Sequence, residues 1–183
     1  MSRQYWAELI AWAVASGATV NSASETILFP NVTVPANYMQ DGRVLRLRVQ
    51  GQWTTTGSTP TQIFNLRWGG VAGTLLAKTA AITTVASTTA AVWDLDIIVQ
   101  TRSNGSSGTV MAIGIATMHA GVAPTIASAT GAAAVTPMTV GGVLAPAIAT
   151  IDATADTALS ITGTSSTTAL TLIGLNYLIE SLN

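Results

Sequence analysis

The sequence predicts an all-β protein, an antiparallel β sandwich of about eight strands preceded by a short N-terminal helical arm. From residue 25 onward, apolar and polar residues alternate in short runs, which is the pattern of half-buried strands. Clusters of Gly, Pro, Ser, Thr and Asn separate these runs, as turns do between strands. Helical patterns do not alternate with the runs, so the sequence does not predict a parallel sheet built from βαβ units.

The N-terminal segment carries the one convincing helical pattern. Between residues 5 and 15, apolar side chains recur at positions i, i+3, i+4 and i+7, which predicts an amphipathic helix. The residues of this stripe are Trp6, Leu9, Ile10 and Ala13. A helix of this length is marginal in water by itself, so we expect it to be ordered only when it docks on another surface.

The same segment supplies the candidate interface. The small residues after it predict a linker, so we divide the chain into an arm and linker, residues 1–24, and a β domain, residues 25–183. The linker lets the arm reach outward, and we therefore expect it to dock on another molecule rather than on its own sandwich. Aromatic side chains are enriched at interface hot spots. The candidate interface residues are Tyr5, Trp6, Leu9, Ile10 and Trp12.

Within the β domain, alternation places the strands in order. In the run 44–53 the residues Leu45, Leu47 and Val49 share one face, and two arginines lie on the other. Proline at position 30 interrupts the first run, which suits an edge strand or a bulge. The eight predicted strands are residues 26–34, interrupted at Pro30, and residues 44–53, 62–68, 74–79, 91–101, 110–118, 157–162 and 168–180.

The connections predict two hairpins and one long loop. Residues 103–108 have the composition of a hairpin turn, and residues 163–166 predict a second hairpin that closes the chain. Residues 120–146 are rich in Ala, Thr, Gly, Pro and Val, and we expect a long loop or extended insertion there. Loops of that length are uncommon unless they have a function.

The number of strands favours a jelly roll, which has eight strands in two Greek keys and is used by viral capsid proteins. The sequence does not fix the order of the strands. A barrel and an immunoglobulin-like sandwich therefore stay open.

The chain is unusually poor in charge. Of its 183 residues, 8% are charged, where about 25% is typical, and its net charge is -1. It lacks the basic patch of clustered Lys and Arg that nucleic-acid-binding proteins carry. It also lacks a run of about 18 strongly apolar residues, which a membrane-spanning helix needs. A charge-poor surface favours association with other proteins. We expect subunits to meet at segment 5–15, whose one charged residue is Glu8, and at the uncharged segment 120–146.

The polar residues do not form a recognisable catalytic or metal-binding motif. Asp94 and Asp96 share one strand face and could act as paired carboxylates, but we favour a solvated face that pairs with nearby arginines. His119 is the single histidine, and no nucleophile-elbow sequence lies near it, so we favour a polar group at a strand end. We expect neither catalytic residues nor a metal or cofactor. The tryptophans expected in the core are Trp53, Trp68 and Trp93.

Short turn and strand motifs follow one another between residues 25 and 180. They are TVPAN at 33–37, GRVLRLRVQG at 42–51, LRWGG at 66–70, WDLDI at 93–97, TRS at 101–103 with Gly105, and LTL at 170–172. In this order the chain resembles a widespread group of tailed-bacteriophage structural proteins. The resemblance implies a jelly-roll virion protein, a trimeric head decoration (cement) protein on the capsid exterior. The helical arm is not part of this pattern.

The expected function is therefore structural and not enzymatic: a capsid decoration protein that bridges and stabilises subunits of the phage major capsid protein. The alternative is a receptor- or carbohydrate-binding module of a phage head or tail fibre, because jelly rolls serve that role too. The loops hold few aromatic residues, which counts against the alternative.

Overall fold

The computed structural model describes residues 7–13, 17, 19–119, 135–139 and 148–182. Every helix or strand assigned among them is a β-strand, which confirms the all-β prediction. The strands are β1 (Glu8–Ala13), β2 (Thr19–Val20), β3 (Thr26–Ile27), β4 (Val32–Val34), β5 (Val44–Thr55), β6 (Thr61–Trp68), β7 (Thr74–Thr79), β8 (Ile82–Thr83), β9 (Ala91–Ser103), β10 (Gly108–Met118), β11 (Val135–Thr139), β12 (Ile148–Ile151), β13 (Thr157–Ser165) and β14 (Leu170–Ser181).

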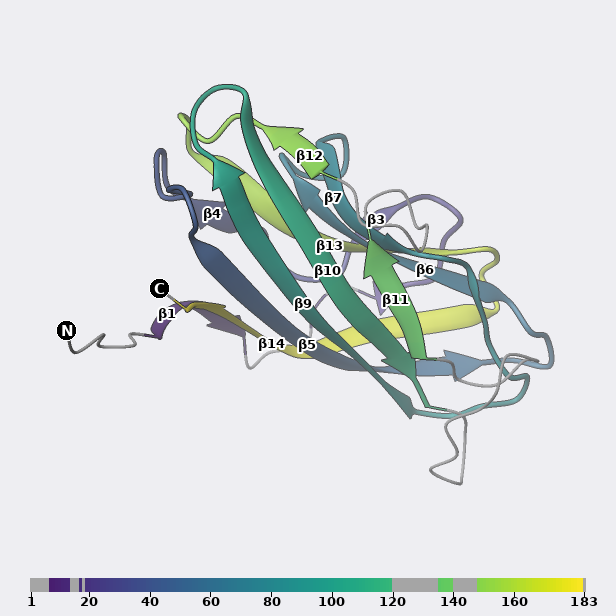
Figure 1. The fold of residues 1–183 in the computed structure, drawn as a ribbon. Coiled ribbons are helices and arrows are strands. Elements are labelled where there is room, and N and C mark those ends of the chain that lie inside the picture. The colour runs from purple at the N-terminus through teal and green to yellow at the C-terminus, as the bar shows by residue number, and fades with distance from the viewer. Residues whose placement is uncertain (1–6, 14–16, 18, 120–134, 140–147, 183) are drawn as a thin grey trace.

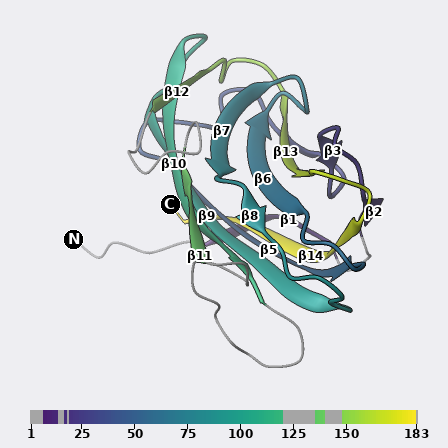
Figure 2. The same ribbon diagram turned by 90° about the vertical axis from the view of Figure 1, so that its right-hand side faces the viewer.

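The strands form two antiparallel layers that pack face to face (Figures 1 and 2). One layer, the long sheet, has the order β1-β14-β5-β9-β10, with β2 beside β14 and with β11 and β12 beside β10. The other layer, the short sheet, has the order β7-β6-β13-β3, with β4 beside β13 and β8 beside β6. Strand β11 also pairs with β7, so it joins the two sheets along one side of the sandwich.

The strand order is that of a jelly roll. When β1 with β2 counts as the first strand and β3 with β4 as the second, the remaining strands in sequence are β5, β6, β7, β9, β13 and β14. The long sheet then contains strands 1-8-3-6 and the short sheet strands 2-7-4-5, which is the double Greek key of the jelly roll. Strands β10, β11 and β12 extend the long sheet beyond this set, and β8 is a short extra strand beside β6 in the short sheet. The order decides between the folds that the sequence left open.

The core lies between the two sheets. Alternate residues of β5 and β9 are buried there, as their sequence patterns predict. The rings of Phe64 in the short sheet and Trp93 in the long sheet lie with their centroids 4.9 Å apart. Trp53 and Trp68 are also buried, so the expected core position of the three tryptophans is confirmed.

A glycine inside β5 makes room for Trp93, one of the two largest fully buried side chains. A Cβ atom on Gly51 would lie 2.5 Å from the Trp93 ring and 2.1 Å from the carbonyl oxygen of Ile173. Without that atom, the indole N–H of Trp93 can donate to the carbonyl oxygens of Gln52 and Ile173, both at 3.2 Å. The glycine therefore marks a close approach between strand backbone and ring.

The predicted N-terminal helix is wrong over Glu8–Ala13, which forms strand β1 on the edge of β14. Ala11 and Ala13 pack against the core, and the phenol O–H of Tyr38 donates to the Glu8 carboxylate at 2.8 Å. The physical reason is tertiary: an unpaired edge of β14 offers the segment backbone hydrogen bonds, and a lone short helix has little stability of its own.

The predicted linker and terminal hairpin also differ from the structure. Within the linker, β2 pairs with β14, and its Val20 is buried. The hairpin around 163–166 is wrong, because β13 and β14 belong to opposite sheets and the connection crosses the sandwich. The hairpin at 103–108 is confirmed by the pairing of β9 with β10. Of the predicted loop 120–146, residues 135–139 form β11; the rest lies outside the described residues.

Candidate interaction surface

The outer face of the short sheet is covered by the chain itself. Asn65, Ser160 and Thr162 point away from the core, yet all three are buried. Ser160 donates its hydroxyl hydrogen to the side-chain oxygen of Asn31 at 2.7 Å, and the side-chain amide of Asn65 donates to Thr162 at 3.3 Å. The chain that precedes β4 therefore closes this face with polar contacts.

A bidentate ion pair is at the centre of that cover. The Arg67 guanidinium on β6 binds both carboxylate oxygens of Glu25, at 2.6 and 2.8 Å, and donates to the Gly73 carbonyl oxygen at 2.9 Å. Thr162 donates its hydroxyl hydrogen to the same carboxylate. Burial opposes ionisation of Glu25, but the hydrogen bonds from Arg67 and Thr162 and the Arg67 charge outweigh it, so the pKa of this carboxyl is lowered.

The outer face of the long sheet is open, and the strand registers order its side chains in rows. One row runs from β1 to β10 and is made of Leu9, Glu180, Arg46, Ile98 and Ile113. The next row is made of Trp12, Leu178, Arg48, Asp96 and Ile115. It lies two residues along on β14, β5, β9 and β10, and three along on β1, whose register shifts between Leu9 and Ala11. Charged side chains therefore occupy the middle of the face, and large apolar side chains lie on both sides of them.

On β9, β10 and β12 these apolar side chains form a cluster that we call the apolar patch. Ile98 lies opposite Ile113, and Met111 lies opposite Ile148. The isoleucines of the patch are between 44% and 58% exposed, although residues of this type are usually buried. The patch consists of Ile98, Met111, Ile113, Ile115 and Ile148.

The charged middle of the face is held together by ion pairs. Arg46 donates to both carboxylate oxygens of Asp96, at 3.1 and 2.6 Å, and the Nε atom of Arg48 lies 3.5 Å from the same carboxylate. The hydrogen bonds from Arg46, together with both positive charges, outweigh burial and lower the pKa of Asp96. This part of the strand face is solvated and paired with arginines, as the sequence predicted.

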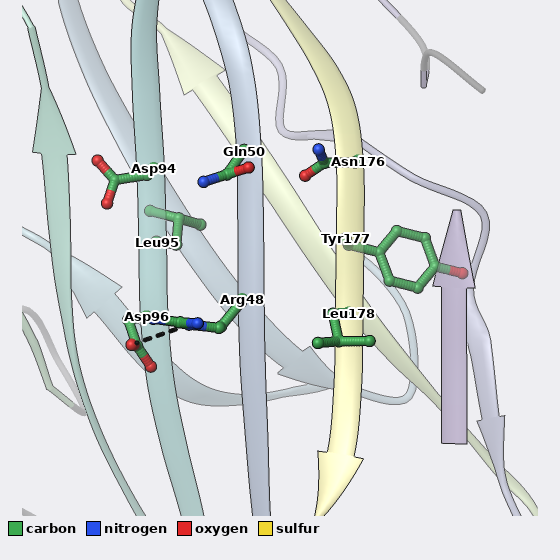
Figure 3. Close-up of a pocket in the computed structure, with 8 residues that line it drawn as sticks. All are labelled: Arg48, Gln50, Asp94, Leu95, Asp96, Asn176, Tyr177 and Leu178. Atoms are coloured by element: carbon green, nitrogen blue, oxygen red, sulfur yellow. Dashed lines mark ion pairs between the residues drawn. The ribbon is translucent and has the colours of Figure 1, made fainter. Parts of the chain in front are cut away.

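A shallow hollow of about 370 Å³ lies on the same face between β9, β5 and β14 (Figure 3). Asp94, Gln50 and Asn176 lie in one row across the three strands, and Asp96, Arg48 and Leu178 form the next row. The backbone of β14 bulges between Gly174 and Asn176, which shifts the register with β5 beside the hollow. The hollow is therefore lined by the planar polar groups of Asp94, Gln50 and Asn176 and, on one side, by the apolar side chain of Leu178.

The residues predicted as the arm interface have different environments. Leu9 and Trp12 on β1 are 50% and 62% exposed on the outer face of the long sheet. Ile10 is partly buried against the core. Tyr5 and Trp6 lie outside the described residues. At the end of β10, the Nε2 atom of His119 lies 3.5 Å from the Asp94 carboxylate.

Sequence reasoning missed the apolar patch and the hollow. A signal for the patch was present, because Ile98, Ile113 and Ile115 occupy positions where alternation calls for polar residues. The hollow depends on which strands are neighbours and on the bulge in β14, and a single sequence shows neither.

Comparison of the chain with protein-family models, with curated proteins and with solved structures found no significant match. Among the described residues there is no helix long and apolar enough to cross a membrane. In the same part of the chain, no three His, Asp or Glu side chains are grouped so that they could hold a metal ion.

Proposed function

We propose that the chain is a non-enzymatic structural protein of a tailed-bacteriophage virion, a decoration (cement) protein that binds the capsid exterior and bridges major capsid subunits. The observation that carries this proposal is the apolar patch on the outer face of the long sheet. The jelly-roll order of the strands and the sequence motifs that resemble phage structural proteins also support it.

The patch has the chemistry of a surface that another protein covers. Contiguous exposed apolar side chains on a folded domain mark interaction sites. Covering what remains exposed of each isoleucine would contribute about 1 kcal/mol, because full burial of such a side chain contributes roughly 1.5–3 kcal/mol. A protein that binds only the assembled shell stabilises that shell by mass action. Bridging needs no catalytic group, only complementary surface.

The proposal includes self-association as a trimer, which the resemblance implies. Three linked copies would present three patches to neighbouring capsid subunits, and linked contacts bind more tightly than one contact alone. We expect the purified protein to have the mass of a trimer in light scattering. A stable monomer would contradict this part of the proposal and would leave shell binding to be tested separately.

The test of shell binding is co-sedimentation with capsid shells that lack the decoration protein. The variant carries Ile113→Thr and Ile115→Thr, which keep the β-branched shape but remove apolar surface. We expect its affinity for shells to fall about thirtyfold, from roughly 1 kcal/mol for each side chain. We expect wild-type binding to change little between low and high salt, since apolar burial dominates.

The matched control is Val92→Thr. Val92 is 52% exposed on the same face of β9, but it lies opposite Gln52, away from the patch. This variant should bind shells as the wild type does. If the double variant decorates shells normally, the patch is not the binding surface. If the occupancy of shells by the wild type falls steeply with salt, apolar burial does not dominate binding. Either result would contradict the proposed way of binding.

A further inference from the structure

The hollow on the long sheet differs in chemistry from the apolar patch. Its volume of about 370 Å³ is in the range of small-molecule sites, which is 300–1,000 Å³. The upper row of Figure 3 contains two amides and a carboxylate, those of Gln50, Asn176 and Asp94. Each amide offers an N–H donor and an oxygen acceptor in one plane, and the carboxylate offers two oxygen acceptors.

These polar groups have unused hydrogen-bonding capacity. The side chains of Gln50 and Asn176 make no hydrogen bond to another residue that the structure describes, and Asp94 has only the 3.5 Å contact with His119. Asp96 and Arg48, by contrast, are paired with each other. A ligand could therefore bind the upper row without breaking a protein hydrogen bond.

The charges around the hollow balance. Asp96 is shared by Arg46 and Arg48, and Asp94 faces the imidazole of His119. A phosphate or a polycation binds where one sign of charge is in excess. Without such an excess, the hollow favours a neutral ligand that can both donate and accept hydrogen bonds.

An apolar wall borders the polar row. Leu178 lines the hollow, and Trp12 lies directly opposite Leu178 on β1, just outside the hollow, where the residue is 62% exposed on the same face. Directly opposed residues of antiparallel strands have Cβ atoms about 5 Å apart. An exposed tryptophan beside planar polar groups fits a sugar ring, whose C–H face is apolar and whose rim carries hydroxyl groups.

We propose that the hollow binds a neutral saccharide. One sugar unit of an oligosaccharide lies against Trp12 next to Asn176, and the following unit exchanges hydrogen bonds with Gln50 and Asp94 farther across the sheet. This adds a glycan-binding activity to shell decoration and does not depend on it. The two surfaces share strand β9, but none of the apolar patch residues lines the hollow. A virion protein with this site would attach particles to neutral surface polysaccharides.

The test is titration of the full-length protein with neutral oligosaccharides of glucose, mannose, galactose and N-acetylglucosamine, followed by calorimetry and tryptophan fluorescence. Sialyllactose and heparin fragments serve as the acidic probes. We expect at least one neutral oligosaccharide to bind and Trp12→Ala to weaken that binding about tenfold. Trp12→Phe should recover part of the loss, and Asn176→Ala should weaken binding severalfold.

The matched control is Leu9→Ala, which removes an exposed apolar side chain from the same strand one row away. It should bind saccharides as the wild type does, and circular dichroism should show every variant folded. Absence of binding to all neutral probes, tighter binding of the acidic ones, or equal binding by folded Trp12→Ala would overturn the proposal. Shell co-sedimentation of Trp12→Ala should be unchanged, so failure here is distinct from failure of the decoration role.

Discussion

The two outer faces of the sandwich are built from the same kind of strand but have opposite environments. On the short sheet, outward-pointing Thr162 and Ser160 are polar and buried under the chain that precedes β4. On the long sheet, outward-pointing Ile113 and Ile115 are apolar and exposed. The polarity of the outward-pointing side chains of a strand therefore does not predict whether other parts of the chain bury that face. The closed face serves stability, and the open face is the one available to other molecules.

The closed face imposes a strict condition on its polar groups. A buried donor or acceptor without a partner costs about 1–3 kcal/mol, so the cover is stable only when its hydrogen bonds are complete. Glu25 and Arg67, whose side chains are 18% and 21% exposed, meet that condition through two direct bonds and the help of Thr162. On the open face, water can replace any partner that is lost.

The largest expected effect concerns the edge of the open sheet. Deleting residues 1–16 removes β1 and uncovers the edge of β14 from Tyr177 to Ser181, with which Glu8–Ala13 pairs. We expect a loss of roughly 3 kcal/mol, because partly buried Ile10, Ala11 and Ala13 and a set of strand hydrogen bonds disappear together. The melting temperature should fall by about 10 °C, and the exposed edge should promote aggregation.

The control for this deletion is Leu9→Ala, whose side chain is half exposed and whose loss should change the free energy of unfolding by about 0.5 kcal/mol or less. If the truncated protein melts at the wild-type temperature, β1 is a separable arm, as the helical pattern predicted. The first strand that the sandwich needs for its stability would then be β2.

The second effect compares one arginine from each face. Arg67→Ala leaves Glu25 mostly buried without its cation, and we expect a loss of about 2 kcal/mol in urea unfolding, less than for a fully buried pair. Arg48→Ala removes a 59% exposed side chain whose ion pair with Asp96 is long, and we expect a loss of about 0.5 kcal/mol or less. Equal losses would show that the two faces do not differ in the way their burial indicates.

Much of the fold could be predicted from the sequence, because period-two alternation is a local signal. Strands β5, β6, β7, β9 and β10 lie within a few residues of their predicted bounds. Strand order is not local, and the terminal hairpin failed because turn composition does not say whether the chain reverses within a sheet or crosses between sheets. Strand β1 failed because its apolar residues satisfy the helical spacing and an edge strand equally well.

The candidate site was less accessible to sequence reasoning. The pairing of Asp96 with arginines could be predicted, because Arg46 and Arg48 share a face and opposite charges attract. The hollow could not, because Asn176 and Asp94 are far apart in sequence and meet only through the strand order of the jelly roll. Trp12 was singled out as an interface residue, but its place beside Leu178 depends on the register of β1.

The smallest effect is a difference in acid stability between the faces. The pKa of Glu25 lies below 4.5 in the folded protein, so its stabilising contribution is complete above pH 4.5. Below that pH the unfolded chain takes up the proton first, and the contribution is lost as the pH falls through the folded pKa. In urea titrations at decreasing pH, Glu25→Gln should therefore flatten the acid-induced fall of the unfolding free energy. Asp96, whose pKa is also lowered, belongs to the exposed face, so Asp96→Asn should flatten that fall less. An equal or larger change for Asp96→Asn would mean that the open face contributes as much charge stabilisation as the closed one.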